Sequence, residues 1–384
     1  MIIAYIARTN IPSKSAHSVH IMKLCAEISK KADKFTLVIP KQEKAEIESD
    51  AFSFYGVDKF DISISDVDIS SKRKGWRFAA DAIRCADKAL GTKAYAVITR
   101  DVFVAALAVL QGKETVLDLH GDIKQITGRW YRLMKFKPFA GSKHLHLVMI
   151  TNSLKDYYQK EYKVVRTDLT VLPDAYDDTA FGKVNQRPVF DISEKAENTN
   201  NPIQIGYIGK MIKGKGIGLI SELAAIDPKH TYHLYGGEKA EVEEKTGIKF
   251  TENVLFHGFI PSAQVPETLQ KMDIMLLPNQ DTMNVGGENI GKVTSPIKMF
   301  EYMAAGRCIV ASDLPVLKEI LSEDLCFFAD AQNASEWKNK IDYIENHRQE
   351  AAKKARDAQV KATQYTWRSR AEGMIRLLQW SKIR

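Results

Sequence analysis

The chain is predicted to be an α/β protein with two doubly wound halves, each a parallel sheet covered by helices on both faces. Apolar strand patterns alternate with amphipathic helical patterns, this order weakens over 176–202, and it restarts at Ile203. A length of 384 residues also fits two domains of ordinary size. We expect one domain at 1–175, a linker or surface loop at 176–202, a second domain at 203–365 and a last helix within 366–384.

In the first half, helical spacing and short apolar runs follow one another. Ile21, Leu24 and Ile28, for example, recur at the intervals of one helix face. The predicted order is strand 2–7, polar loop 10–18, helix 20–29, strand 35–39, helix 77–90, strand 94–99, helix 102–110, strand 115–119, strand 147–150 and a helix from Ser153.

The second half repeats the pattern. Its predicted order is strand 203–209, helix 218–225, strand 232–235, strand 254–256, helix 265–271, strand 274–277 and the loop, helix, turn and strand of 294–312. In doubly wound sheets the ligand lies at the carboxyl ends of the strands. We therefore expect a ligand cleft where the carboxyl ends of the two halves face each other.

Composition and charge restrict the functional class. Four widely spaced cysteines without a Cys-x-x-Cys pair, Cys25, Cys85, Cys308 and Cys326, indicate buried thiols rather than a disulfide or metal site. An excess of 55 basic over 48 acidic residues favours anionic partners. No apolar run reaches the roughly 20 residues of a membrane span, and the start lacks the basic flank of a signal peptide, so we expect a cytoplasmic protein.

The stretch 294–312 predicts an anion site. Ser295 and Pro296 precede a helix that Gly306 ends, and a buried strand follows. The free N–H groups and positive dipole end of such a helix suit a phosphate. Glu301, one turn further on, could accept hydrogen bonds from vicinal hydroxyls such as those of a ribose. The alternative is an ordinary amphipathic helix with a surface carboxylate.

A lysine-bearing turn follows the strand at 203–209. Gly209 to Gly216 resembles a nucleotide-hydrolase phosphate loop, but Gly216 stands where that loop needs Ser or Thr for magnesium, so we exclude it. The glycine spacing of a dinucleotide-binding turn is also absent. Lys210 and Lys215 could neutralise a diphosphate leaving group as its bond breaks. The alternative is a solvated lysine loop.

Three histidines lie near predicted strand or helix ends. His120 follows the strand 115–119 and precedes Gly121, which is a carboxyl-edge position, although a lone His is more often structural. His17 could contact a ligand, and His20 is interpreted as an ordinary helix residue.

The segment 123–143 contains six basic residues and no acidic one. As one helix it would place Trp130 and Leu133 opposite Arg129 and Arg132. A basic helix with aromatics is typical of membrane surfaces, and the alternative is a core-packed helix with a solvated basic face. The basic cluster 71–77 favours an anionic surface, whereas nucleic acid is not expected because no motif for it is present.

Several of these motifs together resemble the donor-site region of GT-B glycosyltransferases of the family 4 type. The residues that carry the resemblance are Ser-Pro-x-Lys-x-Phe-Glu-Tyr-Met-Ala-Ala-Gly at 295–306, Leu119-His120-Gly121, Ile150-Thr151-Asn152-Ser153, Val171 to Asp177, Gly206-Tyr207-Ile208-Gly209 with Lys215-Gly216, and His257 to Pro261. Tyr365-Thr366-Trp367 resembles the start of the family's last helix, which crosses back to the first domain.

The resemblance implies transfer of a sugar from a nucleotide-sugar donor with retention of configuration and without a metal or other cofactor. It assigns Lys210 and Lys215 to the donor diphosphate, Glu301 to the ribose and His120 to the neighbourhood of the donor sugar. The further implied site residues are Gly209, Ser295, Pro296, Ile297 and Lys298 for the phosphates, Phe259 beside the base, and Ser15, Ala16 and His17 in the first-domain loop near phosphate and acceptor.

The sequence also departs from the family pattern. The family often has a second glutamate eight positions before Glu301, where this chain has Val293, and Glu288 is the candidate replacement. Lys210 stands where Arg is commoner, and Asp174 where Asn is usual.

The sequence thus predicts a glycosyltransferase that builds a surface polysaccharide or glycolipid, with a saccharide or lipid-linked acceptor, at the inner face of the membrane. A non-catalytic relative that binds a nucleotide sugar or recruits a partner is the alternative. An epimerase or phosphorylase of the same fold is a third option without a distinct sequence mark.

Overall fold

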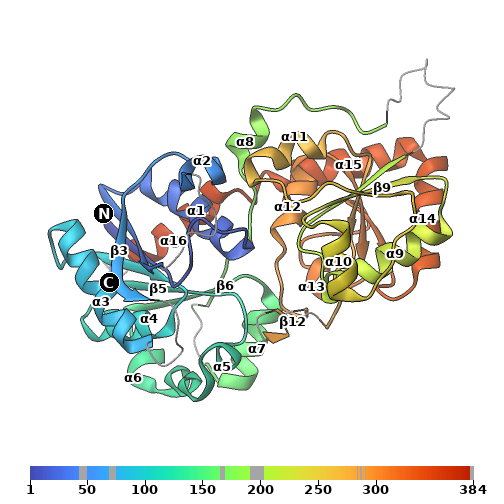
Figure 1. Cartoon of the computed structure of the whole chain (residues 1–384). Helices are drawn as coiled ribbons and strands as arrows, with labels where there is room; N and C mark the ends of the chain where they lie inside the picture. The colour runs from blue at the N-terminus through green and yellow to red at the C-terminus, as the bar shows by residue number, and fades with distance from the viewer. Residues whose placement is uncertain are drawn as a thin grey trace. The chain divides into compact units, whose positions relative to one another are not determined.

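The computed structural model describes residues 1–42, 50–68, 75–164, 169–190, 203–282, 284–285, 288–289 and 291–380. The chain forms two compact units (Figure 1). The first unit comprises Met1–Asp174 and Trp367–Arg384, and the second comprises Ala175–Thr366. Each unit contains its own parallel sheet with helices on it, which confirms the predicted fold class.

The first unit is built on a seven-stranded parallel sheet of order β3-β2-β1-β4-β5-β6-β7. Its strands are β1 (Ile2–Ile6), β2 (Lys34–Lys41), β3 (Ile62–Asp68), β4 (Ala96–Thr99), β5 (Thr115–Leu119), β6 (Leu145–Met149) and β7 (Thr170–Val171). Its helices are α1 (Ala16–Ser29), α2 (Ala51–Tyr55), α3 (Gly75–Leu90), α4 (Val102–Leu110), α5 (Ile123–Thr127), the 3-10 helix η2 (Gly128–Lys135), α6 (Lys137–Ala140), α7 (Asn152–Tyr162) and α16 (Trp367–Trp380).

Sequence patterns explain why the centre of this sheet is buried. All residues of β4 and β5 are buried, as expected for parallel strands that helices cover on both faces. Strand order reverses between β1 and β4, where the Thr99 hydroxyl donates to the Ile6 carbonyl over 2.8 Å. Such a reversal opens the carboxyl edge of the sheet for side chains and ligands.

The last helix of the chain, α16, belongs to the first unit and packs along α1 (Figure 1, red beside blue). Its buried face is spaced at helical intervals by Trp367, Ala371, Met374 and Leu378. The predicted return of the last helix to the first domain is thereby confirmed.

The second unit contains a six-stranded parallel sheet of order β10-β9-β8-β11-β14-β15 and a separate antiparallel pair, β12 and β13. Its strands are β8 (Gln204–Ile208), β9 (Thr231–Tyr235), β10 (Val254–Phe256), β11 (Ile274–Leu277), β12 (Asn284–Val285), β13 (Glu288–Asn289), β14 (Cys308–Ser312) and β15 (Phe327–Ala329). Its helices are α8 (Asp178–Gly182), the 3-10 helix η3 (Lys213–Lys215), α9 (Ile217–Ile226), α10 (Lys239–Thr246), the 3-10 helix η4 (Ser262–Gln264), α11 (Val265–Leu269), α12 (Ile297–Ala304), α13 (Pro315–Lys318), α14 (Ala334–Asn346) and α15 (Arg348–Ala362).

Part of the segment expected as a linker is ordered and belongs to the second unit. Helix α8 lies within it, and Val189 and Phe190 are buried in the second core. Arg187 donates to the carbonyls of Gln270 and Met272 at 2.9 and 3.0 Å. The polar composition of the segment gave no sign of these buried residues and hydrogen bonds. The remainder of the segment, 191–202, lies outside the described residues.

The four cysteines are free thiols; Cys25, Cys308 and Cys326 are buried as the sequence predicts, whereas Cys85 is only partly buried. In the part of the chain that the structure describes, no helix combines the length and apolar character needed to cross a membrane.

Candidate active site

In the first unit, His120 emerges directly from the carboxyl end of β5. Its Nε2 lies 2.9 Å from Oδ2 of Asp118, which is the fourth residue of the same strand. Residues two apart in a strand point to the same face, and this spacing allows the contact. Because a carboxylate only accepts, His120 Nε2 carries the proton and Nδ1 is left with a lone pair.

Asp118 is buried and is paired with Arg370 of α16. The Arg370 Nη2 donates to Asp118 Oδ1 over 2.7 Å, and its Nη1 donates to the carbonyls of Leu172 and Pro173. Both side chains are at most 2% exposed. A residue of the last helix therefore compensates the charge that orients His120.

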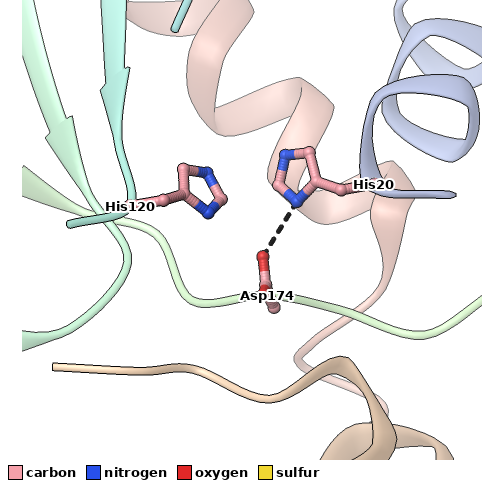
Figure 2. Close-up of side chains that lie close together, drawn as sticks. All are labelled: His20, His120 and Asp174. Atoms are coloured by element: carbon pink, nitrogen blue, oxygen red, sulfur yellow. Dashed lines mark hydrogen bonds and ion pairs between the residues drawn. The ribbon is translucent and has the colours of Figure 1, made fainter. Parts of the chain in front are cut away.

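His20 of α1 and Asp174, which follows β7, complete this group, and Figure 2 shows the two imidazoles and the carboxylate converging. His20 Nδ1 lies 2.9 Å from Asp174 Oδ1, and the His20 and His120 rings meet edge to face with centroids 4.6 Å apart. The interpretation of His20 as an ordinary helix residue did not anticipate this pairing. It is buried, and Trp367 packs on it at 4.9 Å.

The electrostatics of the cluster keep the imidazole of His120 neutral. Burial, and next the Arg100 guanidinium, lower the pKa of His120 to about 3. Burial alone would raise the pKa of the Asp118 carboxyl, but Arg370 and His120 outweigh it and hold that pKa well below its usual range. At physiological pH, His120 is therefore a hydrogen-bond acceptor at Nδ1 rather than a cation.

Among the residues that the structure describes, His20, His120 and Asp174 form a group whose ligand atoms could hold a metal ion, because these atoms lie within 4.8 Å of one another. Two guanidinium groups, Arg100 and Arg370, already act on the carboxylates of the cluster. A divalent ion would add positive charge beside them and displace the His20 to Asp174 hydrogen bond. The residues thus fit a hydrogen-bonded network better than a metal centre, and the expectation of no cofactor stays a prediction.

The predicted first-domain loop ends at the start of α1. Ser15 is its N-cap, accepting from the Ser18 amide, and Ala16 is the first helical residue. His17 is held near the cluster: burial, then Arg100, lower the pKa of His17 well below its usual range. Ser15 and Ala16 are exposed, and the structure brings only His17 of the three toward His120.

In the second unit, strand order reverses between β8 and β11, and the predicted lysine turn lies at this reversal. Gly216 has φ +79°, and a Cβ there would lie 2.0 Å from the Pro278 carbonyl oxygen. Gly236, after β9, would likewise bring a Cβ within 2.2 Å of the Gly209 oxygen. The loops that follow β8, β9 and β11 therefore pack backbone against backbone, which only glycine permits.

Lys210 and Lys215 flank this turn, and Lys298 of α12 joins them. Burial, and next Lys210, lower the pKa of Lys215. Burial, and next Lys215, lower the pKa of Lys298 well below its usual range. Each of these lysines thus disfavours the charged form of its neighbour. Such a group of like charges is typical of an anion site.

Helix α12 starts where the sequence predicts. Pro296 is its N-cap and supplies no side-chain hydrogen bond, Ile297 is its first residue, and Ser295 is buried just before it. The N-cap residue of this eight-residue helix therefore caps none of its first amide groups with a side chain. Glu301 lies half-buried one turn further on.

Two buried polar atoms at neighbouring strand ends escaped sequence analysis. Asn279 Oδ1 follows β11, Ser312 Oγ ends β14, and neither has a hydrogen-bond partner among the described residues. An unsatisfied buried polar group costs about 1–3 kcal/mol. Their shared position at the carboxyl edge, next to the lysine turn, is the signal that could have identified them.

Of the remaining predicted residues, Phe259 is 37% exposed in the loop after β10. Glu288 lies in β13, but its side chain lies outside the described residues. Val293, where a glutamate is often found, lies just before α12.

The segment 123–143 does not form the single helix expected. It is broken into α5, the 3-10 helix η2 and α6, and the breaks fall at Gly128 and before Pro138. Glycine and proline both disfavour a helix interior. Of the basic cluster 71–77, residues 71–74 lie outside the described residues.

An aromatic–basic patch nevertheless forms around η2. Trp130 is 40% exposed and packs against Trp76 and Phe103, with ring centroids 5.8 and 5.7 Å apart. We use the name for these three rings together with the exposed Arg132, Lys135 and Phe136.

Two α/β units, each with a parallel sheet, make up the fold found in GT-B glycosyltransferases. In this chain the carboxyl edge of the second sheet is also rich in lysine. Residues 202–346 match the family described as Glycosyl transferases group 1, and they cover most of the second unit. The chain thus carries a domain of this family, which confirms the resemblance. The finer assignment to family 4 stays a prediction.

Particular relatives agree with this domain assignment. A 2-deoxystreptamine glucosyltransferase of Streptomyces kanamyceticus is 22% identical over 222 residues, which cover 55% of this chain and 54% of the relative. The "Putative teichuronic acid biosynthesis glycosyltransferase TuaH" of Bacillus subtilis (strain 168) is 24% identical over 203 residues, which cover 50% and 48%. The chain therefore spans about half the length of these curated relatives.

A solved structure shares the fold of the whole chain. Anabaena Alr3699/HepE in complex with UDP has a TM-score of 0.69 at 13% identity, over 99% of this chain and 100% of that chain. The roles of individual residues remain predictions.

Proposed function

We propose that the protein is a glycosyltransferase that transfers a sugar from a nucleoside-diphosphate sugar to a saccharide or lipid-linked acceptor, in the assembly of a surface polysaccharide or glycolipid. The observation that carries the proposal is the convergence of three lysines and the start of α12 at the strand-order reversal of the second sheet. The functions of the two relatives and the UDP complex of HepE support it.

In the proposed reaction, Lys210 and Lys215 stabilise the diphosphate as its negative charge grows. The amide groups at Ile297 and Lys298 bind phosphate oxygens, and Glu301 accepts from the ribose hydroxyls. His120, neutral and with its Nδ1 lone pair available, accepts a hydrogen bond from a sugar hydroxyl. The acceptor hydroxyl attacks the anomeric carbon on the face from which the diphosphate departs. The bond between that carbon and the diphosphate oxygen breaks, and the hydroxyl proton passes to the departing diphosphate, so that configuration is retained without a metal.

Nucleotide binding tests the proposal. UDP, GDP, ADP, CDP and dTDP are added in EDTA, with the matching monophosphates as controls. At one hundred times its Kd, a bound diphosphate stabilises by about 2.7 kcal/mol, which raises Tm by roughly 5–10 °C for a unit of this size. Absence of any shift with all five diphosphates would contradict the proposal, and a shift seen only with added Mg²⁺ would contradict the metal-free mechanism.

A second candidate function is a non-catalytic relative that binds a nucleotide sugar and recruits a partner. Val293, in place of the glutamate frequent in the family, favours it. Binding of a nucleoside diphosphate without turnover of any nucleotide sugar would be its expected result.

We further propose that the aromatic–basic patch binds anionic lipid at the inner membrane face, where a lipid-linked acceptor would lie. Half-exposed tryptophan beside exposed basic side chains is typical of interfacial segments. We expect cosedimentation with phosphatidylglycerol-containing vesicles but not with pure phosphatidylcholine vesicles. Because each basic residue contributes about 1 kcal/mol, the double variant Arg132→Ala, Lys135→Ala should bind about 30-fold more weakly.

The matched control for vesicle binding is Lys88→Ala, Lys93→Ala. It also removes two positive charges, but near the C-terminal end of α3, whereas Trp76 lies at the N-terminal end of that helix. Equal loss of binding in the two double variants would show nonspecific attraction by net charge and would overturn the lipid-binding proposal.

A further inference from the structure

Lys298 presents a buried amine that no established contact explains. It is the second residue of α12, it is 9% exposed, and its Nζ has no hydrogen-bond partner among the described residues. The Nζ lies 4.1 Å from the ring centroid of Tyr207 in β8. A buried polar group without a partner is costly, and the Tyr207 ring beside this amine gives it no hydrogen bond.

The groups around this amine set its charge state. Tyr207 faces it from β8, and burial raises the pKa of that phenol, so the ring is neutral. In addition to burial, Lys215 of η3 lowers the pKa of Lys298, and Lys210 in turn lowers the pKa of Lys215. Glu301 and Tyr302 follow Lys298 on α12. Burial and, second, Lys215 lower the pKa of Lys298, whereas the Tyr207 face favours the ammonium form.

Hydrogen bonds hold the Tyr207 ring in place, and the ring in turn defines the position of the Lys298 amine. The Tyr207 hydroxyl donates to the Lys210 carbonyl over 3.1 Å, and the Tyr302 hydroxyl accepts from the Ile208 amide over 2.9 Å. These bonds tie α12 and the lysine turn to the same strand. The amine, the Lys215 side chain and the start of α12 therefore belong to one rigid part of the second unit.

We propose that Lys298 is a third cation of the diphosphate subsite and takes up one proton from solvent when a nucleoside diphosphate binds. This inference rests on the proposed function. Phosphate oxygens are the one feature of such a ligand that can both hydrogen-bond the amine and favour its charged form. The empty subsite then carries less positive charge than three lysines imply, and full charge develops only with the ligand in place.

The sign of the pH dependence follows. A lowered pKa in the free protein and a higher pKa in the complex mean that binding is strongest where Lys298 is already protonated. Affinity therefore weakens as pH rises through the lowered pKa of free Lys298 toward the ordinary lysine value of about 10.4. A lysine with an ordinary pKa would leave affinity unchanged over the lower part of that interval.

Isothermal titration calorimetry measures the proton directly. UDP, or GDP or ADP where the panel above favours it, is titrated in EDTA at pH 8, at which a terminal phosphate of pKa about 6 is already ionised. The titration is repeated in Hepes and in Tris, which differ in ionisation enthalpy. We expect proton uptake by the wild type, less uptake by Lys298→Met, because Lys215 with its lowered pKa remains, and about 10- to 100-fold weaker binding by that variant.

Two further variants keep the test sharp. Lys298→Arg supplies a cation that stays charged, so it should bind with less proton uptake than the wild type. Lys213→Ala, an exposed lysine of the same 3-10 turn, should behave like the wild type. Melting temperatures without nucleotide show whether each variant is folded, and the pH dependence of the wild type is informative even where Lys298→Met is not.

Unchanged proton uptake or unchanged affinity in folded Lys298→Met, while the wild type binds the nucleotide, would overturn this inference alone. Failure of the wild type to bind any nucleoside diphosphate would overturn the proposed function and this inference together.

Discussion

Replacing Arg370 with Met is expected to lower the free energy of unfolding by about 3–5 kcal/mol. The substitution leaves the Asp118 carboxylate buried without its cation and the Leu172 and Pro173 carbonyls without their donor. Removing one partner of a buried ion pair is more destabilising than the pair itself is stabilising, because an uncompensated charge remains. Chemical denaturation monitored by tryptophan fluorescence, with Trp367 in the same helix, measures the change.

The matched control is Arg376→Met, an exposed arginine of the same helix, which should change the free energy of unfolding by less than about 0.5 kcal/mol. The double variant Asp118→Asn, Arg370→Met removes both charges and should be more stable than Arg370→Met alone. A double variant as unstable as the sum of the two single variants would contradict the pairing.

The same pair gives a pH test. The folded-state pKa of Asp118 is lowered, so its stabilising contribution is present above the ordinary carboxyl pKa of about 3.9 and is lost as pH falls through the folded value. Without Arg370, Asp118 is protonated at a higher pH. The difference between wild type and Arg370→Met should therefore shrink as the solution is acidified.

Lys215→Ala is expected to reduce kcat/KM for sugar transfer by about 100- to 1000-fold, the usual effect of removing one group that stabilises developing charge. Lys215 lies in the turn whose backbone is pressed against Pro278 at Gly216, so its position is fixed before the donor binds. Initial rates at saturating and subsaturating nucleotide sugar separate the loss into kcat and KM. A loss confined to KM would assign Lys215 to ground-state binding only.

Lys213→Ala is again the control, and it should retain wild-type rates. Glu301→Ala, by contrast, should raise KM for the donor more than it lowers kcat, because the ribose is remote from the bond that breaks. If the protein were a non-catalytic relative, Lys215→Ala would weaken nucleotide binding and no variant would show turnover to lose.

Sequence periodicity was sufficient for the main architecture. The strands around β1, β5 and β11 were predicted because buried parallel strands are continuous apolar runs. Strand β3 was missed, since Ile62 and Ile64 alternate there with Ser and Asp, and Ile64 is 62% exposed at the sheet edge. The break at η2 was missed because apolar spacing was given more weight than Gly128.

The sequence predicted those parts of the candidate site whose residues are close together in the chain. Lys215 and the start of α12 are local patterns, and the structure places them together at one sheet edge. Arg370 could not be inferred, because its pairing with Asp118 spans 252 residues and no local pattern records it. His20 was missed for the same reason, since its partner Asp174 belongs to a distant segment.

The return of α16 to the first unit also sets an order of events during synthesis. Asp118 leaves the ribosome 252 residues before Arg370, which is about 13–50 s at 5–20 residues per second. The histidine cluster is therefore completed only after the entire second unit has been translated. Until then, a nascent chain must carry the first sheet without the Arg370 partner of Asp118.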